Sequence, residues 1–181
     1  MDTDRELVSR CLQRESASQE ILYRRFAPVM FGICLRYANN SYDAQDLLQE
    51  GFIRVFSKLH HYRGDGSLEG WIRRIMVTTS INYCVRKIKT NREVDLTEAN
   101  SAATISEDAL SILTTAELLG VIRDLPVGFR TVFNLFVIEG YSHRQIAEML
   151  GITENTSKTH LYRAKALIRK KLAAIGINDK Q

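Results

Sequence analysis

Apolar residues recur every three to four positions along almost the whole chain, and the strict alternation typical of strands is rare. A clear example is the helix predicted at residues 18–39, whose apolar face comprises Leu22, Phe26, Val29, Ile33 and Tyr37. Only 2 prolines and 10 glycines occur in the 181 residues, which is too few for a turn-rich sheet protein. The sequence therefore predicts an all-α fold.

The first 90 residues predict a small helical bundle. A short helix should precede Ser16, and Ser41 is a plausible N-cap for a later amphipathic helix. Two glycines in "HHYRGDGS" (residues 60–67) break the pattern, after which Ser67 can cap a long helix.

That long helix contains the only tryptophan of the chain, in "GSLEGWIRRIMVTTSINYCVRK" (residues 66–87). Trp71 falls on the same face as Leu68 and Ile75, so we expect it to be a partly buried anchor. Arg73 and Arg74 should project to the side of this helix.

Charge and composition divide the chain into three parts. Residues 91–110, "NREVDLTEANSAATISEDAL", are polar, acidic and weakly periodic, which predicts a linker. The formal net charge of the chain is +4, and the basic excess lies before and after this acidic stretch. This distribution suits two modules that face nucleic acid and a connecting segment that does not.

Between the linker and the last motif, "AELLGVIRDL" predicts a helix that Pro126 ends, followed by a helix up to Gly140.

Residues 141–171, "YSHRQIAEMLGITENTSKTHLYRAKALIRKK", have the pattern of a helix-turn-helix. Ser142 with Gln145 predicts a near capping box, Gly151 permits a tight turn, and Thr153 caps a long basic helix. The beginning of such a second helix enters the major groove, where short polar side chains read base edges. Ser157 stands at a position that usually holds a buried apolar residue, so we expect loose packing there.

A helix-turn-helix alone is also typical of repressors and of response-regulator output domains. These would leave the basic, tryptophan-bearing first half unexplained. The alternative that we keep is a DNA-binding regulator with a ligand- or partner-sensing helical domain.

Three motifs in order resemble one family. "DAQDLLQEGFIRVFSKL", then "GSLEGWIRRI", then the helix-turn-helix are similar to bacterial RNA polymerase sigma factors of the extracytoplasmic-function (ECF) group, over residues 7–172. The resemblance implies a sigma-2-like domain at residues 1–90, a flexible linker at residues 91–110 and a sigma-4-like domain at residues 111–181. It implies a transcription initiation factor that binds core RNA polymerase, recognises −35 and −10 promoter elements and assists strand opening. It also implies an anti-sigma factor as a partner.

The resemblance assigns three groups of site residues. The polymerase-binding group comprises Asp46, Leu47, Leu48, Gln49, Glu50 and Phe52. The −10 group comprises Arg63, Trp71, Arg73, Arg74, Thr78, Asn82, Arg86 and Lys87, and the loop at residues 60–67 matches a loop that captures a flipped-out base. The −35 group comprises Arg144, Asn155, Thr156, Lys158, Thr159, His160, Arg163 and Lys165. Thr78 and His160 stand where the family often has asparagine and arginine, respectively, which affects the promoter sequence rather than the function class.

An enzyme is the third class, and the sequence does not favour it. The four histidines and the carboxylates have no metal-site or triad spacing, so neither a cofactor nor a metal ion is expected. The 3 cysteines are widely separated and read as free thiols of a cytoplasmic protein. The sequence has neither a membrane-span pattern nor a signal-peptide pattern, so we expect no membrane insertion.

Overall fold

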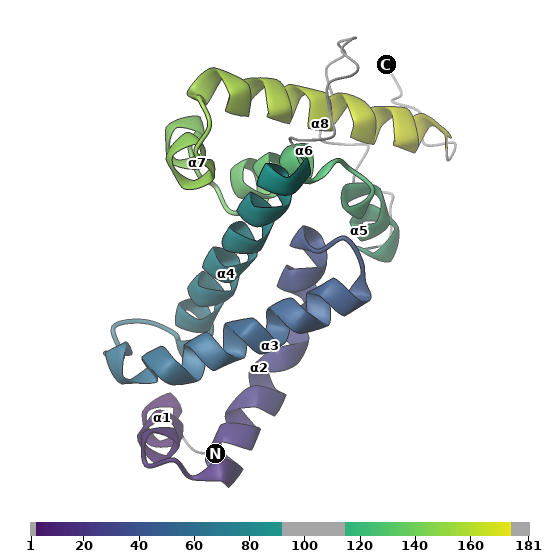
Figure 1. Ribbon diagram of the computed structural model, residues 1–181. Coiled ribbons are helices and arrows are strands. Elements are labelled where there is room, and N and C mark those ends of the chain that lie inside the picture. The colour runs from purple at the N-terminus through teal and green to yellow at the C-terminus, as the bar shows by residue number, and fades with distance from the viewer. Residues whose placement is uncertain (1–2, 92–114, 175–181) are drawn as a thin grey trace. The chain divides into compact units, whose positions relative to one another are not determined.

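The computed structural model describes residues 3–91 and 115–174, and all regular elements in these two ranges are helices (Figure 1). The described residues agree with the predicted all-α fold. The predicted linker at residues 91–110 lies outside them, apart from Asn91. Among the described helices, none is long and apolar enough to cross a membrane. The chain divides into two compact units, Met1–Ser80 and Ile81–Gln181, and each is described by itself.

The first unit is a bundle of helices in which α2 and α3 pack along each other (Figure 1). Its elements are α1 (Asp4–Leu12), α2 (Ser16–Tyr37), α3 (Ser41–Lys58), the 3-10 turn η1 (Leu59–His61) and the beginning of α4 (Leu68–Asn91). The unit boundary falls inside α4, after Ser80. Apolar side chains from α2, α3 and α4 fill the hydrophobic core, among them Leu22, Phe26, Met30, Leu47, Phe52, Val55, Leu68, Ile72 and Met76.

Two helix caps in this unit can be compared with prediction. Ser67 accepts a hydrogen bond from the backbone N–H of Gly70 (3.1 Å), which confirms it as the cap of α4. The predicted cap of α3 is wrong by one residue. Asn40 has the extended backbone of an N-cap, and its side-chain oxygen accepts from the N–H of Asp43 (2.8 Å), while Ser41 is already helical.

The second unit contains α5 (Thr115–Arg123), α6 (Val127–Phe133), the π-helical turn η3 (Asn134–Ile138), α7 (His143–Leu150) and α8 (Glu154–Ala174). The single helix predicted before Gly140 is therefore α6 continued by a π turn, closed by a hydrogen bond from Glu139 N–H to Asn134 O (3.0 Å). Pro126 is the N-cap of α6. Arg130 is almost fully buried and donates to the carbonyl of Arg123 (2.6 Å), which ties α6 to the end of α5.

Candidate nucleic-acid interface

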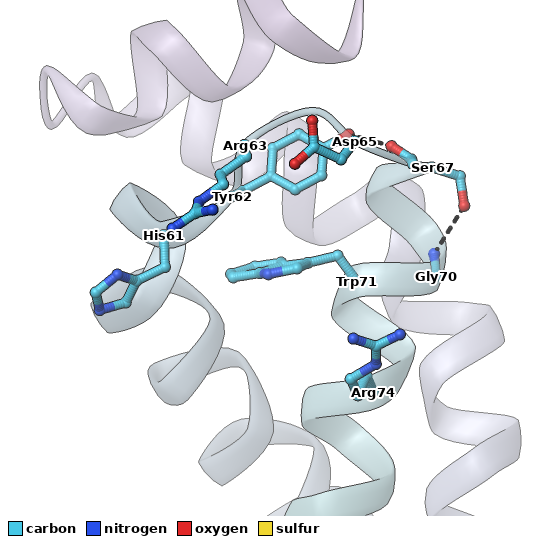
Figure 2. A pocket seen from close by; sticks show the side chains of 9 residues that line it. His61, Tyr62, Arg63, Asp65, Ser67, Gly70, Trp71 and Arg74 are labelled. Atoms are coloured by element: carbon cyan, nitrogen blue, oxygen red, sulfur yellow. Dashed lines mark hydrogen bonds between the residues drawn. The ribbon is translucent and has the colours of Figure 1, made fainter.

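The loop between η1 and α4 forms one wall of an open pocket of about 350 Å³ (Figure 2). Aromatic and charged side chains line it together: His61, Tyr62, Arg63, Asp65, Trp71 and Arg74. Figure 2 shows the loop arching above the Trp71 indole, with Arg74 below it on the same helix. Planar rings beside cationic groups are the combination that holds unpaired bases and their phosphates.

Short-range contacts fix the shape of this loop. The Tyr62 hydroxyl donates to the carbonyl of Gly66 (2.7 Å) and closes the loop across its base. Gly64 has φ +80°, which L side chains rarely adopt, and it lies close to the side chain of Arg5 from α1. These contacts close the loop in front of α4.

Trp71 is half-buried, which agrees with the predicted partial burial. Its ring lies 5.7 Å from that of Tyr62 at 59°, so it lines the pocket, while Leu68 and Ile72 of the same helix are fully buried and anchor α4. Tyr62 and Asp65 belong to the loop at residues 60–67 that the resemblance assigned to base capture, but they were not singled out, because a loop has no periodicity that reveals which side chains face inward.

Of the other residues of the −10 group, Arg63 is exposed in the loop and the rest lie along α4. Arg73, Arg74 and Thr78 are exposed, and the Thr78 hydroxyl donates to the backbone carbonyl of Arg74 (2.8 Å). Asn82, Arg86 and Lys87 lie further along α4, in the part grouped with the second unit. Lys87 is half-exposed, with its ammonium 5.5 Å from the centre of the Tyr83 ring.

The polymerase-binding group on α3 needs a correction. Leu47, Leu48 and Phe52 are 2%, 7% and 3% exposed, because they face α2 and the hydrophobic core. These three side chains are therefore not available on the surface of the unit. Asp46 and Gln49 are exposed, and Glu50 is half-exposed in an ion pair with Arg54 (2.7 Å).

Two exposed apolar side chains on α3 were not predicted from the sequence. Tyr42 is 81% exposed and Ile53 is 69% exposed. Together with Asp46 and Gln49 they follow helical spacing along one side of α3, which we call the α3 outer face. The spacing was visible in the sequence, but helical spacing alone does not say which side of the helix is covered.

The helix-turn-helix has the predicted geometry. Ser142 and Gln145 form a full capping box at the start of α7, and Gly151 ends this helix in the left-handed conformation with φ 64°. Thr153 accepts from the N–H of Thr156 (3.0 Å) at the start of α8. Ile146, Leu150 and Leu161 are buried in this unit, and α7 packs against α8 (Figure 1).

The −35 group is only partly on the outer side of α8. Asn155, Lys158 and Thr159 are exposed; Thr156, Arg163 and Lys165 are half-exposed; and Arg144 is exposed on α7 beside Glu148 (3.4 Å). Lys158 forms an ion pair with Glu154 (3.0 Å) that is exposed enough to open for a phosphate.

His160 packs against α6. Its ring meets the Phe129 ring edge-on at 5.1 Å and its Nδ1 is buried, while the side chain as a whole is half-exposed. The Arg163 guanidinium also lies over Phe129, at 5.9 Å. Tyr162, 42% exposed, was missed and lies on the outer side one turn after Thr159.

Ser157 does not produce the loose packing that its polarity suggested. It is fully buried, and its hydroxyl lies 2.9 Å from Nδ1 of His143. Burial lowers the pKa of His143, the nearby Lys158 lowers it further, and Glu154 acts in the opposite direction. The neutral imidazole is therefore the favoured form at this position.

We expect the chain to lose stability as the pH falls below the ordinary His143 pKa of 6.5. Because the pKa is lower in the folded state, the unfolded chain binds the proton more readily, and the His143 contribution is lost as the pH falls through this window. Thermal unfolding followed between about pH 7.5 and pH 5.5 should show this dependence, and His143→Asn should flatten it. An unchanged pH dependence in the variant would assign the effect to other groups.

Comparisons with known proteins agree with this architecture. Residues 22–90 match the family Sigma-70 region 2, and residues 110–168 match Sigma-70, region 4. The chain is 25% identical to the RNA polymerase sigma-H factor of Pseudomonas aeruginosa, with 94% of each chain covered. It is 26% identical to the ECF RNA polymerase sigma-E factor of Haemophilus influenzae, covering 94% of this chain and 95% of that protein.

A solved structure has a similar fold. It is the sigma factor RpoE of Bartonella quintana in complex with the anti-sigma factor NepR, which is 16% identical, with a TM-score of 0.50 over 89% of this chain and 98% of that one.

A region 2 match followed by a region 4 match, on two helical units of this kind, defines a sigma factor of the sigma-70 type. The chain belongs to the ECF group of these factors, and it is a transcription initiation factor that directs RNA polymerase to promoters. The family is one of non-enzymatic transcription factors.

Proposed function

We propose that residues 1–90 bind core RNA polymerase and hold the opened −10 element, that residues 91–110 act as a linker, and that residues 111–181 bind the −35 element as duplex. The observation that carries this proposal is the loop pocket, where Trp71 and Tyr62 stand beside Arg63 and Arg74. Such a pocket suits a base that has left the stack, with its phosphates on the exposed arginines of α4. The exposed polar and basic residues at the start of α8 suit a major groove.

The α3 outer face is the proposed polymerase-binding surface. Tyr42 and Ile53 give it exposed apolar area, and Asp46 and Gln49 add polar contacts between them. This combination of apolar anchors and a polar surround is typical of protein interfaces. It keeps Asp46 and Gln49 of the predicted group and takes Tyr42 and Ile53 in place of the buried Leu47, Leu48 and Phe52.

We further propose that the protein acts in the cytoplasm beside its polymerase, has no catalytic activity of its own, and is held inactive by an anti-sigma factor. The Bartonella quintana neighbour of similar fold was solved with such an inhibitor. The regulator alternative differs in one testable respect, since a regulator need not bind core polymerase.

Transcription in vitro from a randomised promoter pool tests the proposal. With bacterial core polymerase, the full chain should enrich two separated sequence elements, and neither residues 1–90 nor residues 110–181 should do so alone. Failure of the full chain to bind core polymerase would favour the DNA-binding regulator instead.

Two proposed roles of α8 residues, phosphate contact and base recognition, should differ in how the affinity for promoter DNA depends on salt concentration. Lys158→Ala should weaken all enriched promoters about equally and reduce the slope of log affinity against log salt by roughly one unit, because one phosphate contact is lost. Thr159→Ala should instead change the preferred −35 sequence, at about 1–3 kcal/mol per lost base contact. His160→Ala is expected to lower thermal stability without changing preference, because its ring packs on Phe129. Identical preference shifts in all three variants would contradict this division.

A further inference from the structure

A polar bridge crosses the helix-turn-helix. The ring of Phe136 in η3 stacks on the ring of His143 at the start of α7, with 4.4 Å between centroids and 22° between planes. Nδ1 of His143 lies 2.9 Å from Oγ of Ser157 in α8. Three elements of the second unit are thus joined through one imidazole.

This bridge lies within an otherwise apolar contact. Ile146 and Leu150 of α7 and Leu161 of α8 are buried in the same unit, whereas Ser157 places a hydroxyl there at 0% exposure. Apolar contacts tolerate small rotations of one helix on another, because dispersion is not directional. A hydrogen bond weakens steeply when its angle changes, so it favours one rotation of α8 relative to α7.

The bridge also lies near the beginning of α8, the end of the helix that is proposed to contact base edges of the −35 element. Ser157 is buried in the first turns of the helix, and its sequence neighbours Asn155, Lys158 and Thr159 are exposed. A small rotation of α8 about its axis would move these side chains relative to base edges. Because each base contact needs aligned donors and acceptors, rotation changes which bases are accepted.

We propose that His143 and Ser157 are positioning residues that fix the rotation of α8 against α7 and so set the sequence preference at the −35 element. Phe136 holds the imidazole in plane, and the neutral ring accepts from or donates to the Ser157 hydroxyl according to its tautomer. This inference rests on the proposed role of α8 as the −35 reading helix.

The test uses the full chain with bacterial core polymerase and a duplex pool randomised over the upstream element. Ser157→Ala should weaken binding to the sequence that the wild type enriches by about fivefold, the equivalent of one net hydrogen bond. It should also broaden the set of enriched sequences. His143→Ala should behave alike, and the double variant should lose no more than either single one. His143→Asn, which keeps a polar atom near Nδ1, should recover part of the preference.

Ser142→Ala is the matched control, because it removes the capping box of α7 without touching α8. Ser142→Ala should lower thermal stability and leave the enriched sequences unchanged. Broadening by Ser142→Ala as well, or additive losses in the double variant, would overturn the positioning role. If the wild type enriches no upstream sequence, the proposed −35 function fails, and that outcome is distinct from equal enrichment by wild type and Ser157→Ala.

Discussion

Replacing Ile53 with aspartate should abolish binding of the chain to core RNA polymerase and leave the helical bundle folded. The Ile53 side chain is 69% exposed, so the free chain loses almost no buried contact. In the proposed complex, the aspartate would place a charged group where the exposed apolar Ile53 side chain contributes to the α3 outer face. We expect at least about thirtyfold weaker binding, since residues that anchor interfaces contribute about 2 kcal/mol or more. Titration of fluorescently labelled core polymerase measures this loss.

The neighbouring residue provides the control. Phe52 is 3% exposed, and its ring packs 4.7 Å from Tyr23 and 6.2 Å from Phe56. Truncation of a buried phenylalanine costs about 3–5 kcal/mol, and a buried charge adds to this. Phe52→Asp should therefore lose helical circular dichroism and cooperative unfolding. If Ile53→Asp unfolds as well, or binds polymerase normally, the α3 outer face is not the docking surface.

Replacing Trp71 with alanine should prevent stable promoter opening while polymerase binding and −35 recognition persist. Stacking of a base on an aromatic side chain contributes about 1–3 kcal/mol, so the open complex should become roughly 5- to 150-fold less populated. Permanganate reactivity of unpaired thymines in the −10 region reports this population directly. Trp71→Phe keeps a ring on the pocket wall and should retain most of the opening.

Stacking can be separated from loop shape. Tyr62→Phe preserves the second ring of the pocket but removes the hydroxyl that holds the carbonyl of Gly66 at 2.7 Å. It should reduce opening by less than Trp71→Ala. A template that already carries a mismatched, open −10 region should partly rescue both variants, because the unpairing cost is then absent. Normal opening by Trp71→Ala would remove the indole from the proposed mechanism.

Local features of the fold followed from the sequence with good precision. The helical period predicted the helices of the first unit, and Ser67, Ser142, Gly151 and Thr153 take the cap and turn roles assigned to them. These signals are local, since a cap hydrogen bond joins residues only three apart in the chain. The one misplaced cap, Asn40 instead of Ser41, involves adjacent residues that are both good N-caps.

The sequence by itself determined the helical fold, most of the helix caps, the order of the two units and, through its motifs, the family. Tertiary structure alone decided which side of each helix is covered. The Leu48 side chain is buried and the His160 ring packs on Phe129, whereas Ile53 and Tyr162 are exposed. Ser157 lies within hydrogen-bond distance of His143. The physical reason is that periodicity is a property of one helix, whereas burial and long-range hydrogen bonds depend on the neighbours that packing brings against it.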